Sequence, residues 1–133
     1  MTTTITSSPA DLLRAGYGAF SIGELPVLEA LFAPDAVWHE PGNSPISGSY
    51  VGWPAVAGLL VSYAERSHGT FVAELSDVLA NETQAMSIAH VRAHNNGRTI
   101  DQDNHLLIRV ADGRVAEARV IYTDQTAIDA FWA

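Results

Sequence analysis

Glu40 is the residue of this sequence best suited to proton transfer. It ends a short run of strand-forming residues, 35–40, and the turn pair Pro41-Gly42 follows it. Side chains alternate along a strand, so Glu40 is expected to share a face with Trp38. A carboxylate beside an indole in an apolar cleft is poorly solvated, which raises its pKa and makes it a better base near neutral pH. The alternative is a solvated acid at the end of a strand.

Two further segments carry polar side chains that could hydrogen-bond a carbonyl group. In the segment 100–110 the even positions are mostly apolar, so Gln102 and Asn104 are expected on the same inward face as Leu106. Tyr17 falls on the helical face that also carries Phe20. The alternatives are that Tyr17 is a core aromatic with its hydroxyl at the rim, and that Asn104 is a buried amide with partners inside the protein.

The five histidines do not predict a metal site. His90 and His94 are four residues apart, which on a strand places them about 13 Å apart, too far to share an ion. Cysteine is absent, and we find no phosphate-binding loop, Ser-His-Asp signature or dinucleotide fingerprint, so no metal and no cofactor is expected. The segment 85–94 has no clear apolar face. If its even positions face inward, His90 is a candidate proton-transfer group.

Composition limits the partners. Fifteen acidic residues against seven basic ones give a formal charge of −8, a surface that would repel nucleic acid and anionic lipid. No apolar run is long enough to span a bilayer, and the N-terminus lacks the features of a signal peptide, so a cytoplasmic location is expected. A length of 133 residues predicts a single domain, 1–133, with residues 1–8 as a polar tail.

The elements expected along the chain indicate an α+β fold. Helical spacing and capping residues predict helices over about 9–21, 24–32 and 53–66, and a last helical turn that Asp124 caps and Trp132 ends. Residues 42–52 are expected to form a loop. Strand patterns over 71–79, 85–94, 100–110 and 115–122 are separated by turn signals, which predicts an antiparallel meander.

Three stretches together resemble the SnoaL-like and ketosteroid isomerase families of the nuclear transport factor 2-like superfamily: Glu29 to Gly42, Val110 to Glu117, and Tyr122 to Trp132. This resemblance implies a cone-shaped fold, with three N-terminal helices packed on a strongly curved, mainly antiparallel sheet around a pocket. It implies a homodimer through the outer sheet face. The fold hosts many reactions, so the resemblance does not choose among them.

The resemblance places Glu40 where the isomerases carry their catalytic aspartate. Those enzymes also use a tyrosine and an aspartic acid that donate hydrogen bonds to the developing oxyanion. Here Gly16 falls at the tyrosine position, with Tyr17 one residue later, and Leu106 falls at the aspartic acid position. The isomerase oxyanion hole is therefore not present as such. Asp124 matches, with a shift in spacing, the catalytic aspartate of the cyclases, and capping of the last helix is its alternative role.

The expected catalytic residues are thus Glu40, Asn104, Tyr17, His90 and Asp124. A second group is expected to contact the substrate: Trp38, Phe20, Trp53, Leu60, Tyr63, Gln102, Leu106 and Tyr122. The leading hypothesis is a cofactor-free enzyme of isomerase or polyketide-cyclase type that moves a proton on a small, apolar, carbonyl-containing molecule. Three alternatives stay open. These are a pocket that binds without turnover, an epoxide-hydrolase-like site that would need an arginine such as Arg92, and an assembly module.

Overall fold

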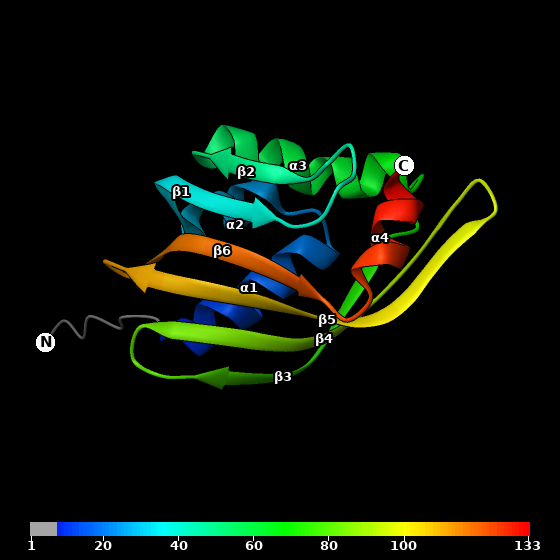
Figure 1. Cartoon of the computed structure of the whole chain (residues 1–133). Helices are drawn as coiled ribbons and strands as arrows, with labels where there is room; N and C mark the ends of the chain where they lie inside the picture. Colours follow the sequence, from blue (N-terminus) through cyan, green and yellow to red (C-terminus); the bar gives the residue numbers. More distant parts are fainter. Residues whose placement is uncertain (1–7) are drawn as a thin grey trace, which may run out of the picture.

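The computed structural model describes residues 8–133, and the expected polar tail lies almost wholly outside them. Helices α1 (Pro9–Ser21), α2 (Leu25–Leu31) and α3 (Trp53–Arg66) pack on one face of a curved six-stranded sheet, as Figure 1 shows. The strands are β1 (Phe32–Glu40), β2 (Gly48–Val51), β3 (Val72–Ala80), β4 (Gln84–Asn95), β5 (Arg98–Ala111) and β6 (Arg114–Tyr122). The last helix, α4 (Gln125–Trp132), lies at one end of the sheet beside the long β4–β5 hairpin (Figure 1). The expected α+β class is confirmed.

The sheet order is β2-β1-β6-β5-β4-β3. Strands β3 to β6 form the expected antiparallel meander, whereas β1 lies parallel to β6. This parallel pair was not predicted, because neither strand carries a local signal for its partner. It brings residues near the start of the chain beside residues near its end.

Two local boundaries differ from the sequence prediction. The second helix ends at Leu31, and Phe32 is already extended, with φ −100° and ψ 144°. Pro34 limits how far α2 can extend, because a proline disfavours helical backbone in the residue before it, here Ala33. The expected loop 42–52 contains the short strand β2, whose Val51 pairs with Val37.

The structure shows which face of strand β4 points inward. Its odd positions, among them Ser87, Ala89 and Val91, are buried, while Ile88, His90 and Arg92 lie on the outer face. Helix α1 packs directly over β3 and β4, and this close approach favours small residues beneath it. The hypothesis that His90 faces inward is therefore wrong. None of the helices in residues 8–133 is both long and apolar enough to cross a membrane.

Candidate functional site

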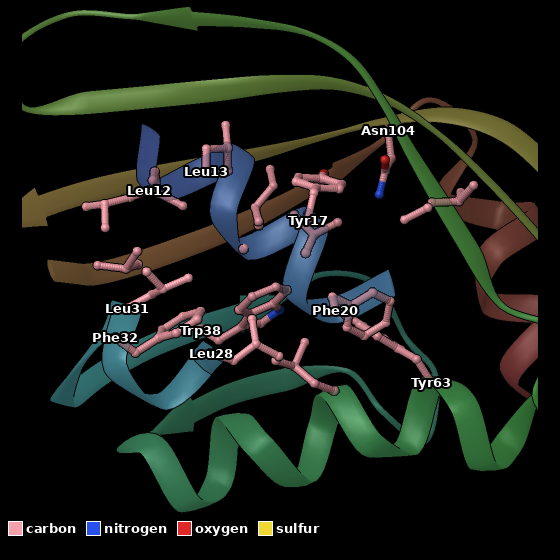
Figure 2. A pocket seen from close by; sticks show the side chains of 18 of the residues that line it. Leu12, Leu13, Tyr17, Phe20, Leu28, Leu31, Phe32, Trp38, Tyr63 and Asn104 are labelled. Carbon is pink, nitrogen blue, oxygen red and sulfur yellow. The ribbon is translucent and has the colours of Figure 1, made fainter. Parts of the chain in front are cut away.

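A cavity lies between helices α1 to α3 and the inner face of the sheet, with a volume of about 90 Å³. Its wall is formed almost entirely by aliphatic and aromatic side chains, several of which Figure 2 shows converging on one space. Among residues 8–133, none of the side chains that line the cavity carries a charge. The polar atoms available to a ligand therefore belong to tyrosines and to Asn104. Such a lining suits a small, neutral, mostly apolar molecule.

Glu40 is buried at this site, with 3% of its surface exposed. Its atom Oε1 accepts hydrogen bonds from the Tyr63 hydroxyl and, at 3.4 Å, from the indole Nε1 of Trp38. Its atom Oε2 accepts a hydrogen bond of 2.7 Å from the Tyr122 hydroxyl. Both carboxylate oxygens thus have donors. Tyr63, Tyr122 and Trp38 line the cavity, whereas Glu40 itself stands behind them.

The parallel strand pair explains how these groups meet. Glu40 is the last residue of β1 and Tyr122 the last residue of β6. The carboxyl ends of parallel neighbours lie at the same edge of a sheet, so the two side chains point into the same end of the core. Tyr63 reaches them from the buried stripe of α3, together with Leu59 and Leu60. Alternation on β1 places Trp38 and Glu40 on one face, as predicted.

Burial dominates the electrostatics of this cluster. Loss of water raises the pKa of Glu40 above its ordinary value, and the hydrogen bonds from Tyr63, Tyr122 and Trp38 offset that rise only in part. The negative charge of Asp129 on α4 adds to the increase. The pKa values of Tyr63 and Tyr122 lie well above their ordinary value, first because both are buried and then because they face Glu40. The prediction of a buried Glu40 beside Trp38 with a raised pKa is confirmed.

Asn104 presents the other polar side chain of the cavity. It is 8% exposed, and its Oδ1 atom has no hydrogen-bond partner within the described part of the chain. It is the cross-strand partner of Tyr122, and Figure 2 shows it pointing toward the cavity. A buried acceptor without a partner destabilises the protein by about 1 to 3 kcal/mol. A ligand that donates a hydrogen bond to Oδ1 would recover that free energy.

Tyr17 also lines the cavity, but its hydroxyl has a partner. It lies 2.8 Å from Oγ of Ser87, and that oxygen also accepts a 2.8 Å hydrogen bond from the backbone N–H of Leu106. Burial raises the pKa of Tyr17, and the hydrogen bond with Ser87 opposes the rise. Ser87 was not among the expected residues. Only its burial in the structure, between two strands, indicates that it holds the Tyr17 hydroxyl. Tyr17 therefore forms a fixed part of the wall.

The structure brings six of the expected contact residues to the cavity wall. Glu40 lies directly behind that wall, and four other residues of the expected set are separated from it. The six are Trp38, Phe20, Leu60, Tyr63, Leu106 and Tyr122. Trp53, one of the four, begins α3 and packs on Phe32, with ring centroids 5.2 Å apart. It lies behind the cavity wall because Phe32 occupies the inner position.

The other three displaced residues have structural partners. His90 lies on the outer face, where its ring nitrogens bond the carboxylates of Asp101 and Asp103. Asp124 caps α4 by accepting a 3.0 Å hydrogen bond from the N–H of Ala127, which is the alternative role considered for it. Gln102 is turned to the backbone of Asp124, accepting from its N–H at 3.0 Å and donating to its carbonyl at 3.2 Å. These contacts hold α4 against the sheet.

Metal ligands do not gather in the described residues. Within 8–133 no group of three or more His, Asp or Glu side chains is arranged to hold an ion. Arg92, the arginine that a hydrolase site would need, bonds Glu74 on the outer face. The chemistry available at the cavity is therefore that of one carboxyl group, three tyrosines and one amide.

Comparison with known proteins gives the family. The SnoaL-like domain family matches residues 13–118. An uncharacterized protein of Mycobacterium tuberculosis H37Rv is 35% identical over 124 residues, which are 92% of this chain and 95% of the relative. The structure of Bal32a, from a soil-derived mobile gene cassette, superposes with a TM-score of 0.91 at 32% identity, covering 94% of this chain and 96% of that one.

A more distant structure shows the fold alone. An NTF2-like protein from Burkholderia xenovorans LB400 superposes with a TM-score of 0.79 at 22% identity, covering 97% of this chain and 100% of the other. The cone of helices on a curved sheet is thus the nuclear transport factor 2-like fold that the resemblance implied. With a family match over most of its length and this architecture, the chain belongs to the SnoaL-like domain family.

Proposed function

We propose that this protein is an enzyme of isomerase or cyclase type that moves a proton on a small, neutral, carbonyl-containing molecule, with Glu40 as the proton acceptor. The observation that carries the proposal is a buried carboxyl group with a raised pKa at the end of an apolar cavity. A carboxylate with a raised pKa is a stronger base than an ordinary glutamate, which is the property that general-base catalysis needs. Membership of the SnoaL-like family is consistent with this class of reaction.

Asn104 supplies the second half of the proposed reaction. Removing a proton next to a carbonyl group leaves negative charge on the carbonyl oxygen, and a preorganised donor stabilises that charge. The side-chain amide of Asn104 can donate through its Nδ2–H groups, and the residue lines the cavity. It takes the place of the donor that the isomerase pattern would have put at position 106.

Size and charge restrict the substrate. The lining contains no cation that could pair with a carboxylate or a phosphate, so anionic ligands are disfavoured. The cavity of about 90 Å³ is smaller than the roughly 150 Å³ that holds benzene in an engineered core, so even a one-ring ligand requires side chains to move. We therefore expect compact aryl or cyclic ketones among the best probes.

Deuterium exchange tests the proposal without a known substrate. Acetophenone in heavy water exchanges the protons next to its carbonyl, and we expect the protein to accelerate this exchange, followed by NMR. Glu40→Gln should slow the catalysed exchange by about a hundredfold or more, the scale that a general base supplies. Glu117→Gln, on the outer face, should leave the rate unchanged. Equal exchange rates for the Glu40→Gln variant and the parent would end the proposal.

A further inference from the structure

Both carboxylate oxygens of Glu40 are directed at aromatic side chains that line the cavity. Oε1 faces Tyr63 and Trp38, and Oε2 faces Tyr122. The three aromatic side chains line the cavity, and Glu40 does not. A ligand in the cavity therefore meets aromatic hydroxyl groups before it meets the carboxyl group.

The proton on Glu40 decides how these hydroxyls are oriented. An ionised carboxylate only accepts, so both tyrosines turn their O–H groups toward it and offer lone pairs to the cavity. A protonated carboxyl group must place its own O–H. The indole of Trp38 only donates, so the acceptor has to be a tyrosine oxygen. That tyrosine then has its own O–H free.

Tyr122 is better placed than Tyr63 to turn its hydroxyl outward. The ring of Tyr63 is stacked on Phe71, with centroids 5.0 Å apart, and also contacts Trp132 at 5.9 Å. Tyr122 is only partly buried and is the strand partner of Asn104, whose side chain points toward the cavity.

We propose that the ligand contacts Glu40 through the hydroxyl of Tyr122, which donates a hydrogen bond into the cavity when Glu40 is protonated and accepts one when Glu40 is ionised. The proposal deepens the proposed function and rests on it in one respect, that the cavity binds a small neutral molecule. It makes Tyr122 a specificity-determining residue. A ketone, which only accepts, is favoured by the protonated form, and an alcohol or enol can satisfy either form.

Asn104 cannot produce the same effect. An amide offers a donor and an acceptor at every pH, so its contribution to the binding of a ketone stays constant. A change in ketone affinity with pH therefore isolates the hydroxyl of Tyr122 from the amide. The comparison of a ketone with the alcohol of the same skeleton removes the apolar contribution as well.

The effects of the other titratable groups near Glu40 can be distinguished from the effect of Glu40 itself. Asp129 on α4 raises the pKa of Glu40 by its charge, while Tyr50 on β2 and Tyr17 on α1 are hydroxyls whose own pKa values are raised by burial. Arg66 acts on Tyr50. Asp129→Asn removes a negative charge and should lower the pKa of Glu40. It should move the midpoint of any pH effect to lower pH without reducing its amplitude.

The test measures the affinity of three matched probes by calorimetry from about pH 5 to about pH 9, a range that spans a raised carboxyl pKa. The probes are acetophenone, 1-phenylethanol and ethylbenzene. Acetophenone should lose about tenfold in affinity as the pH rises through the pKa of Glu40, the worth of one hydrogen bond. The alcohol should lose less, and ethylbenzene should not respond to pH.

Tyr122→Phe should flatten the acetophenone curve and leave ethylbenzene binding intact. Tyr50→Phe is the matched control, because the Tyr50 hydroxyl donates to the Ile46 carbonyl and not to the cavity. Linkage requires the reciprocal effect, so acetophenone should raise the pKa of Glu40 in a carbon-13 NMR titration while ethylbenzene should not. This second measurement uses the parent protein and does not depend on how well the variant folds.

The outcomes separate this inference from the proposed function. Acetophenone affinity that does not vary with pH, or that varies equally in parent and Tyr122→Phe, overturns the role of Tyr122 and does not affect the proposed function. A ketone affinity that depends on pH through Tyr122, in a protein whose Glu40→Gln variant exchanges protons as fast as the parent, supports the inference and removes the proposed enzyme. Failure of all three probes to bind overturns both.

Discussion

Glu40 and Glu117 lie on neighbouring strands and on opposite faces of one sheet, and their pKa values move in opposite directions. Glu40 accepts hydrogen bonds from three aromatic side chains, yet its pKa is raised. Glu117 bonds His39 at 2.8 Å and approaches Arg109 at 3.6 Å, and its pKa is lowered. Its side chain is 40% exposed, against 3% for the whole of Glu40. Loss of water therefore outweighs the number of hydrogen-bond donors.

His90 extends the comparison to a basic group. It lies on the outer face, and its pKa is raised chiefly by hydrogen bonds to Asp103 and Asp101, with desolvation opposing them. On the outer face, hydrogen-bonding partners are the largest cause of the pKa shifts. On the inner face, burial is the largest cause. One sheet therefore carries a solvated ionic surface on its outer face and an apolar cavity on its inner face.

A second copy of the chain bound to the outer face of the sheet would change the comparison of the two faces most, because it would bury groups that now face solvent. We expect a homodimer through this face, which carries Ile121, 41% exposed, and Leu107 among the charges. Light scattering should give twice the chain mass of 14.2 kDa. Ile121→Asp should return the mass to that of one chain. A parent protein that is monomeric at micromolar concentration would contradict the expectation and keep the outer face in water.

Substitutions of aliphatic residues should show the next largest contrast. Ile108 on the inner face of β5 is 1% exposed, so Ile108→Ala should lower the free energy of unfolding by about 2 to 5 kcal/mol through lost packing and the cavity left behind. Leu79 on β3 is 54% exposed, and Leu79→Ala should change it by less than about 0.5 kcal/mol. Urea denaturation measures both. Similar losses at the two sites would show that the outer face is not solvated.

The two glutamates should give the smallest but most specific contrast, in how stability depends on pH. Glu40 has a raised pKa in the folded state, so its stabilisation is complete below its ordinary value of 4.5 and is lost as the pH rises through the folded pKa. Glu117 has a lowered pKa, so its stabilisation is present above 4.5 and is lost as the pH falls through the folded pKa.

Urea denaturation across pH tests these signs with matched variants. In the parent protein, the free energy of unfolding should fall above pH 4.5, by about 1.4 kcal/mol for each pKa unit that separates the folded and unfolded states. Glu40→Gln should remove this fall. Glu117→Gln should change the free energy of unfolding only below that pH. The change should stay under about 1 kcal/mol, because the pair of Glu117 and His39 is exposed. If both variants changed stability in the same pH range, burial would not be the cause that separates them.

Local patterns in the sequence predicted what depends on local geometry. The alternation of Trp38 and Glu40 on one strand, and of Asn104 and Leu106 on another, follows from the pleat and is confirmed. Helix α1 begins where Ser8 caps it and Pro9 enters its first turn. Each of these features is decided by residues within a few positions of one another.

What could not be predicted depends on contacts between distant segments. The orientation of His90 follows from the packing of α1 over β4, which no pattern inside β4 reveals. The partners of Glu40 were each expected near the pocket, but their convergence on its two oxygens requires the parallel pairing of β1 with β6. Sequence spacing showed which side chains could do chemistry. Only the assembled sheet showed which of them meet.

The parallel pairing of β1 with β6 also determines when the site can form during folding. Glu40 is separated from Tyr63 by 23 residues and from Tyr122 by 82, so its partners arrive only after a long loop has closed. Closing such a loop carries an entropic cost that local helices and hairpins avoid, and contacts of this range are slow to form. Trp38, which is paired with Ala118 of β6 and is 5% exposed, should therefore change its fluorescence when the chain closes on itself.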